Sequence, residues 1–216
     1  MRKMMKSIVC LAIAAALVLS LAACGCGYSN SPDGVVKRVL NARNNYDYVT
    51  LEKYYEDGEE YEDMAKDGVK DLKTYYDWLI DEDRYEEEED EMGEKAFKAY
   101  INAKIEIKKA YNKRCKVEID KVKKDGDEAE VKYTEYYPET KKGEYELMEK
   151  AAKNVDLKDE FQENKLDEKE WEKVIKEWKK LALEQIKEAD LEDYDGEIFV
   201  VKDDGKWKIA EDQSGE

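Results

Sequence analysis

The four cysteines are the side chains best able to do chemistry in this chain, because a thiolate is a strong nucleophile and there is no histidine. Cys24 directly follows the segment Leu21–Ala23. Residues 1–6 are basic, and residues 8–21 form an almost wholly apolar run. A basic start, an apolar segment and small residues are the layout of a secretory signal peptide. The run is shorter than the ~20 residues of a membrane-spanning helix.

The segment ending at Cys24 resembles the signal of bacterial lipoproteins. This resemblance implies that residues 1–23 are removed and that Cys24 becomes the N-terminal diacylglyceryl cysteine. The chain would then be anchored at the extracytoplasmic face of the cell membrane, with residues 24–31 as a lipidated tether. An ordinary signal peptide or a single membrane span is the alternative.

The remaining thiols limit other chemistry. Cys10 leaves with the leader, and Cys26 and Cys115 could form a disulfide in an oxidising compartment. Glycines flank Cys26, and this flexible setting argues against the bridge. Two cysteines provide neither a zinc site nor a CxxC redox pair.

The lack of histidine excludes Ser-His-Asp and Cys-His nucleophile systems and histidine-ligated metals. No phosphate-binding glycine motif is present, and we expect no cofactor. Any acid–base chemistry would rest on carboxylates, lysines or tyrosines. Such an enzyme would need a desolvated carboxylate among aromatic residues. The candidates are the strand residues Glu118, Glu130 and Glu135, with Tyr100 or Trp207 as aromatic neighbours.

The formal net charge of −17 becomes about −20 once a leader with three basic residues is removed. Such a chain should repel nucleic acid and anionic head groups, so we expect no nucleic-acid partner. Six consecutive acids, Glu86–Glu91, suggest a calcium site, but they lack the alternating ligands and central glycine of an EF-hand loop. A solvated, self-repelling segment is the simpler interpretation.

Helical patterns dominate the first half of the folded part. Ser31 and Pro32 are suited to open a helix with an apolar stripe that ends near residue 44. A second helical stretch covers about 50–81, with breaks expected at Gly58 and Gly68. A third covers about 94–112, although Ile105 and Ile107 alternate and could begin a strand.

From residue 114 the apolar period changes to two, which predicts two hairpins. The first turns at residues 124–126, and a three-residue loop would pair Ile119 with Val131 and Val117 with Tyr133. The second turns at residues 203–205 and would pair Val201 with Trp207 and Phe199 with Ile209. This last hairpin would be apolar on both faces.

A helical insertion at about 143–190 separates the hairpins. Asp167 and Glu170 form a capping-box pattern before an apolar stripe. Trp171 and Trp178 share one face of that helix. They could stack on a ligand or line a partner groove, but core packing is the more common role of such a stripe.

Three segments resemble small secreted lipoproteins with a nuclear-transport-factor-2-like (cystatin-like) domain. They are the first helix at Ser31–Leu40, the hairpin at Lys124–Val131 with its Asp-Gly-Asp-x-Ala-x-Val pattern, and the hairpin at Val201–Ile209 with its Asp-Gly-Lys-Trp-Lys-Ile pattern. The resemblance implies an α+β fold, with helices packed on a curved antiparallel sheet as a cone. A single domain would cover 32–212, departing from the plain cone at the insertion.

These features predict a non-enzymatic, lipid-anchored binding or scaffolding protein. Its partner would be an envelope protein, a peptide or a small ligand in the cone. The alternatives are a carboxylate-dependent isomerase or hydrolase and a cation-binding envelope protein that uses the acidic run.

Overall fold

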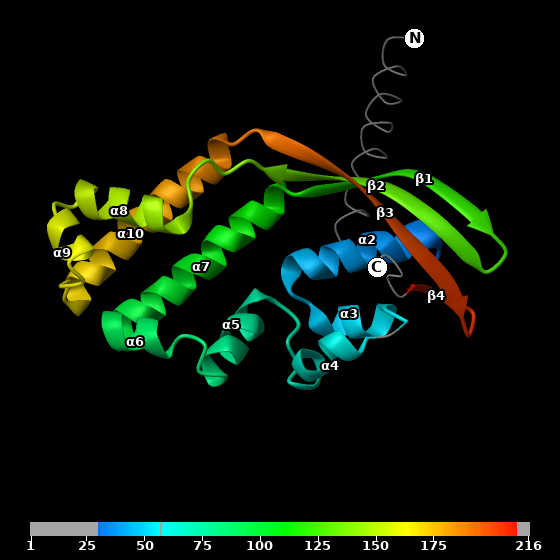
Figure 1. Cartoon of the computed structure of the whole chain (residues 1–216), viewed down its shortest axis with the longest axis horizontal. Coiled ribbons are helices and arrows are strands. Elements are labelled where there is room, and N and C mark those ends of the chain that lie inside the picture. Colours follow the sequence, from blue (N-terminus) through cyan, green and yellow to red (C-terminus); the bar gives the residue numbers. More distant parts are fainter. Residues whose placement is uncertain (1–29, 57, 211–216) are drawn as a thin grey trace, which may run out of the picture.

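The structure is a computed structural model that describes residues 30–56 and 58–210, and it has an α+β fold. Helices α6 to α10 form one end of an elongated molecule, and the sheet with α2, α3 and α4 beside it forms the other (Figure 1). In chain order the elements are α2 (Pro32–Asn45), α3 (Tyr48–Tyr54), α4 (Glu59–Lys66), α5 (Leu72–Asp81), α6 (Glu86–Met92), α7 (Glu94–Arg114), β1 (Lys116–Asp125), β2 (Glu128–Pro138), α8 (Glu144–Asn154), α9 (Lys158–Gln162), α10 (Glu168–Glu188), β3 (Leu191–Asp203) and β4 (Lys206–Ile209).

Side chains cap the helices where the sequence predicts it. Ser31 accepts a hydrogen bond from the backbone N–H of Gly34 at the start of α2, and Asp167 and Glu170 form a complete capping box on α10. The stretch expected at 50–81 contains three short helices, because the chain breaks near both Gly58 and Gly68. Ile105 and Ile107 lie within α7, so the alternative of a strand there is wrong.

The sheet is antiparallel and open, with strand order β1-β2-β3-β4. Both predicted hairpins form, but both loops have two residues and not three. In the first, Asp125 pairs with Glu128, and Gly126 takes φ 61° at the first loop position. Glycine at that position is typical of a type II′ turn, whose twist matches the flanking strands.

A β-bulge corrects the register of the first hairpin. The pairing shifts between Ile119 and Lys121, which places Ile119 opposite Tyr133 and Val117 opposite Glu135. The expected pairs Ile119–Val131 and Val117–Tyr133 are therefore wrong. A loop shorter by one residue shifts the pairing so that apolar residues would face polar ones. The extra residue of the bulge in β1 shifts the alternation back, so the apolar side chains stay on one face of the sheet.

The second hairpin also differs from expectation by one residue. Asp204 and Gly205 have φ 47° and 77°, which is the geometry of a two-residue type I′ loop. Val200 pairs with Ile209, and Lys202 pairs with Trp207. The expected Val201–Trp207 and Phe199–Ile209 pairs are wrong. The expectation that both faces of this hairpin are apolar and covered by other elements is also wrong, because Phe199 is 59% exposed.

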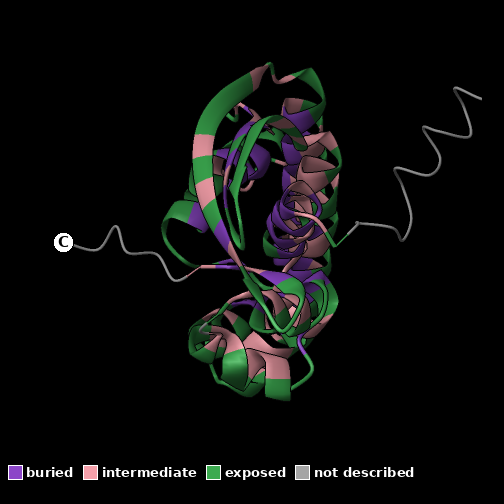
Figure 2. Cartoon of the chain, turned by 90° about the vertical axis from the view of Figure 1, so that its right-hand side faces the viewer, coloured by how far each residue is buried: buried purple, intermediate pink, exposed green. Residues whose placement is uncertain are grey.

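Two apolar clusters fill the interior. One joins the stripe of α2, including Val36 and Val39, to the inward sheet residues Val131, Val200 and Trp207. The other joins α5 through α10 around Trp171 and Trp178. Figure 2 shows the buried residues on facing sides of the sheet and the helices.

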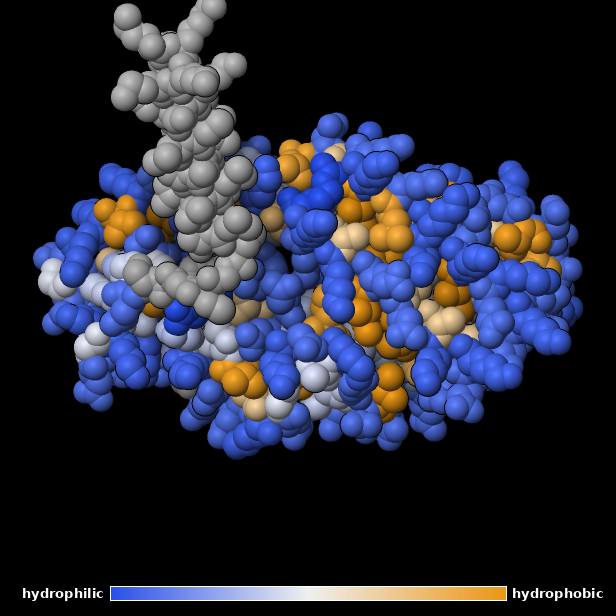
Figure 3. Space-filling model, turned by 180° about the vertical axis from the view of Figure 1, so that it is seen from behind, coloured by the Kyte–Doolittle hydropathy of each residue, from blue (hydrophilic) through white to orange (hydrophobic). Residues whose placement is uncertain are grey.

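Hydrophilic side chains cover most of the face seen in Figure 3, and apolar ones lie between them in separate small patches. Among the described residues, no helix is long and apolar enough to cross a bilayer.

Candidate functional site

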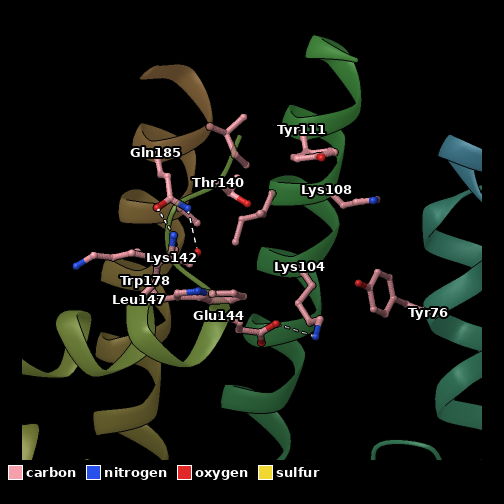
Figure 4. A pocket seen from close by; sticks show the side chains of 14 residues that line it. Tyr76, Lys104, Lys108, Tyr111, Thr140, Lys142, Glu144, Leu147, Trp178 and Gln185 are labelled. Atoms are coloured by element: carbon pink, nitrogen blue, oxygen red, sulfur yellow. Dashed lines mark hydrogen bonds and ion pairs between the residues drawn. The ribbon is translucent and has the colours of Figure 1, made fainter. Parts of the chain in front are cut away.

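A cavity of about 290 Å³ lies between α7, α10 and the segment that leads into α8. This volume is near the lower end of the ~300–1,000 Å³ typical of ligand pockets. In Figure 4, Trp178 and Gln185 of α10 lie across the cavity from α7, and Glu144 lies beside Lys104. Thr140 lies between Gln185 and Tyr111, and the Lys108 side chain extends from α7 away from α10. A larger hollow of about 670 Å³ lies on the outer side of α10, but solvated lysines and glutamates surround it.

Helical spacing places the lining residues. On α7, Lys104, Ile107, Lys108 and Tyr111 occupy positions i, i+3, i+4 and i+7, which share one face. On α10 the corresponding face presents Trp178, Ala182, Gln185 and Ile186. The α7 and α10 helices lie side by side, so the two faces enclose the cavity.

A hydrogen-bonded network lies at the base of the cavity. The Tyr100 hydroxyl donates to Glu144 Oε1 at 2.6 Å, and Lys104 Nζ lies 3.2 Å from Glu144 Oε2 and 3.0 Å from the Tyr100 oxygen. Burial, and then the hydrogen bond to Glu144, raises the pKa of Tyr100 well above its usual range, so the phenol stays a proton donor. Lys104 and Glu144 neutralise each other's charge.

Lys108 has a different environment. Its ammonium lies 5.6 Å from the ring centroid of Tyr46 and 5.0 Å from that of Tyr111, which are cation–π distances. Burial lowers the pKa of this half-buried amine, although the nearby Cys115 thiol partly opposes the shift. Within the described part of the chain, no carboxylate forms an ion pair with Lys108. Its charge is therefore uncompensated.

The upper wall is fixed by backbone contacts. The Gln185 amide accepts from the Lys142 N–H at 3.1 Å and donates to the Lys142 carbonyl at 3.1 Å (Figure 4). Next to it, the Gly143 N–H donates to Glu146 at the start of α8. These contacts connect α10 to the β2–α8 segment and hold this wall of the cavity.

Both tryptophans of the α10 stripe are core residues. Trp171 is 5% exposed and packs edge-on against Phe161, and Trp178 is 3% exposed, with its ring 5.7 Å from Tyr100. Trp178 also lines the cavity, and its indole N–H has no acceptor among the described residues. A buried donor without a partner is uncommon in folded proteins.

The three strand carboxylates have separate environments. Glu118 is exposed, and the half-buried Glu130 lies 3.4 Å from Lys132. Glu135 is 2% exposed on the inward face of β2, where Arg43 of α2 contacts its Oε2 at 2.5 Å.

The acid hydrogen-bonded to Tyr100 is thus Glu144, not one of the three strand residues. Trp207 lies in the sheet core with Val200 and Ile209. Tyr100 and Trp207, the aromatic neighbours expected for a catalytic acid, therefore belong to two different apolar clusters.

The acidic run Glu86–Glu91 lies within the short helix α6 and is mostly exposed. Among the described residues, no three acids or cysteines are grouped so that they could hold a metal ion. Cys115 is a half-buried free thiol. Cys24 and Cys26 lie outside the described residues, so lipidation and a Cys26–Cys115 bridge stay predictions.

Of the residues around the cavity, the sequence pattern singles out Trp178 on one face of its helix, but it does not identify Lys104, Lys108 and Glu144 as a cluster. A signal was present, because Lys104 and Lys108 continue the apolar stripe of α7 where aliphatic residues are expected. Glu144 carried no such signal, since its position depends on how α8 packs.

No known family model matches this chain, and neither a curated protein nor a solved structure matches it.

Proposed function

We propose that this protein is a lipid-anchored, extracytoplasmic binding protein without enzymatic activity, and that the α7–α10 cavity is its ligand site. The cavity carries the proposal, because it joins an apolar floor to a few fixed polar groups. This is the usual composition of a small-molecule site. The side chains around it are already held by the Lys104–Glu144–Tyr100 network and by the Gln185 contacts with Lys142.

The two ion pairs Lys104–Glu144 and Arg43–Glu135 favour binding over catalysis. Lys104 pairs with Glu144, and Glu135 pairs with Arg43, so each carboxylate has a cationic partner. A general base in an isomerase or hydrolase needs a carboxylate free to take a proton from substrate. The carboxylate-dependent enzyme therefore remains the weaker alternative.

The fold we propose is the nuclear-transport-factor-2-like (cystatin-like) cone with the helical insertion at about 143–190. The capped helix α2 against one face of the sheet and the two glycine-containing hairpins support this assignment. Apolar side chains of α2 occupy the space against the sheet, whereas α8 and α10 of the insertion help to line the cavity. The ligand would thus bind beside the insertion and not inside the cone.

Mass spectrometry of the native protein tests the binding function. The mature chain is extracted from membranes in mild detergent and analysed for small molecules released on denaturation. Ala182→Leu should abolish the released ligand, because the added atoms fill the cavity. Leu183→Phe, one residue further and on the outer side of α10, should retain it. If the wild-type protein releases no molecule that Ala182→Leu loses, the proposal is wrong.

Acyl labelling tests the anchor independently. We expect labelled lipid on the wild type and on Cys26→Ser, and none on Cys24→Ser. Equal labelling of all three proteins would refute lipidation at Cys24.

A further inference from the structure

We propose that the outer face of α10 is a docking surface for a partner protein, which contributes an amphipathic helix with acidic residues along one line. This surface, the α10 lysine stripe, consists of five exposed lysines and one half-buried leucine: Lys169, Lys173, Lys176, Lys180, Leu183 and Lys187. The inference goes beyond small-molecule binding, because the stripe lies on the side of α10 that faces away from the cavity.

The spacing of the stripe is that of a contact line between two helices. Its residues follow one another at intervals of four, three, four, three and four positions, which is the heptad spacing of packed helices. At about 1.5 Å per residue, the stripe is about 27 Å long. It lies opposite the buried face of α10, which includes Trp171, Val174 and Trp178 and packs against α7 and α8. A second helix could therefore lie along the outer side of α10.

Charge is segregated on this helix. No acid occupies the stripe, although α10 contains as many glutamates as lysines. Glu172 and Glu184 are exposed on opposite sides of the stripe, and Glu177 is half-buried beside it. A helix surface that only meets solvent typically carries alternating charges that pair with each other. The α10 lysine stripe does not have this arrangement.

Helix stability does not explain the stripe. Lys169, Lys173, Lys176 and Lys180 are successive neighbours at i,i+4 and i,i+3, and like charges at these spacings destabilise a helix. Lys180 lies 3.5 Å from Glu177, but within the described part of the chain no carboxylate forms an ion pair with the other four lysines. Acidic side chains of a partner would pair with these lysines and relieve their repulsion.

An apolar hollow adjoins the stripe. The hollow of about 670 Å³ on the outer side of α10 is lined by Leu183, by Val155 at the end of α8, and by the lysines between them, whose methylene stems are apolar. Apolar side chains of a partner helix would fill this hollow while its acids reach the ammonium groups. A polymer that carries only charged groups would leave the hollow empty, so an amphipathic helix fits better.

The acidity of the rest of the chain favours a narrow partner. The net charge is −17, and Glu172 and Glu184 flank the stripe. A broad anionic surface, such as an anionic membrane, would meet these acids together with the lysines and be repelled. A helix with a single acidic line would contact the lysines and avoid most of this repulsion.

Fluorescence anisotropy with two labelled peptides tests the inference on the mature chain produced without its acyl groups. Both peptides have about 20 residues, enough to cover the stripe as a helix. The first carries glutamates at heptad spacing with leucines beside them, and the second has the same composition with the glutamates spread around the helix. We expect the first peptide to bind at least tenfold more tightly than the second.

Variants of the stripe locate the contact. Lys173→Gln combined with Lys176→Gln should weaken binding of the first peptide at least fivefold and make it less dependent on salt, because two charge pairs are lost. Lys98→Gln combined with Lys109→Gln makes the same charge change at exposed positions of α7 and should leave the affinity within twofold. Leu183→Ser should also weaken binding, since it removes apolar contact in the hollow. Glutamine keeps a high helix propensity, and circular dichroism checks that each variant is folded.

Equal binding of the two peptides would overturn the inference, as would unchanged affinity in the Lys173 and Lys176 double variant or no binding at millimolar peptide. Tighter binding to polyphosphate than to the first peptide would instead identify a charged polymer as the occupant. A preference for phosphatidylglycerol over phosphatidylcholine vesicles would identify a membrane, and either result would contradict the partner helix. None of these outcomes bears on the cavity, because the residues of the stripe do not line it.

Discussion

The ring of Tyr133 lies directly over the backbone of Gly196, its partner in the β2–β3 ladder. A β-carbon at position 196 would lie 2.3 Å from the ring carbon Cζ of Tyr133, which is far inside van der Waals contact. Glycine in the middle of a long strand weakens it unless another group approaches closely. Here the aromatic ring covers the glycine, so the large residue on one strand requires the small one on the other.

Gly196→Ala should therefore destabilise the fold by about 1–3 kcal/mol, the usual cost of forcing extra atoms into a packed site. Urea unfolding measures the change. In a Tyr133→Ala background the same substitution should cost much less, because the obstructing ring is gone. An equal cost in both backgrounds would show that the ring is not the cause.

The ionisation of Asp71 makes the free energy of unfolding depend on pH in the acid range. Its side chain accepts the backbone N–H of Thr74 at 2.9 Å in the capping box of α5, and this bond is the main reason that the pKa of Asp71 is lowered. A lowered pKa in the folded state gives stability that is present above the unfolded value of ~3.9 and lost as pH falls through the folded value.

Asp71→Ala should cost about 1 kcal/mol at pH 7, the typical value of an N-cap, and the difference from wild type should shrink as pH falls below ~3.9. Urea unfolding at several pH values measures this. Asp81→Ala, at the opposite end of the same helix, is the control and should have little effect, since an acid there does not interact favourably with the helix dipole. A difference for Asp71→Ala that is independent of pH would contradict the carboxylate's role.

Sequence patterns predicted most elements because their signals are local. The Ser31 cap, the Asp167–Glu170 capping box and the two glycine turns each depend on a few adjacent residues, and all are present. The hairpin registers failed because loop length and bulges are decided by cross-strand packing. The bulge between Ile119 and Lys121 has no signature that a single strand reveals.

The candidate site was less predictable for a similar reason. Lys104 and Lys108 interrupt an apolar stripe, which is visible in the sequence, but their contacts come from distant segments. Glu144 is 40 residues from Lys104, and Tyr46 of the α2 C-terminus covers Lys108. Such contacts depend on how the helices pack, and no local pattern specifies them.

The Arg43–Glu135 pair joins α2 to β2 and provides a third prediction. Glu135 is almost fully buried, whereas the Arg43 side chain is 49% exposed. Arg43→Met leaves the carboxylate without a cation, and breaking a buried pair costs ~3–5 kcal/mol. Because water reaches the arginine side, we expect a loss nearer 2–3 kcal/mol in urea unfolding. Arg43→Met combined with Glu135→Met should recover most of it, and failure to recover would argue that the arginine acts mainly through its own packing.

Adjacent residues of β3 test the register of the last hairpin. Val200 is 1% exposed and pairs with Ile209, whereas Phe199 is 59% exposed on the opposite face. Val200→Thr places a hydroxyl in the apolar cluster under α2, which should cost about 1–3 kcal/mol in urea unfolding. Phe199→Thr should change stability by less than ~0.5 kcal/mol, as expected for a surface position. The shifted register, with Phe199 opposite Ile209, predicts a large loss at Phe199, so the relative size of the two effects decides between the pairings.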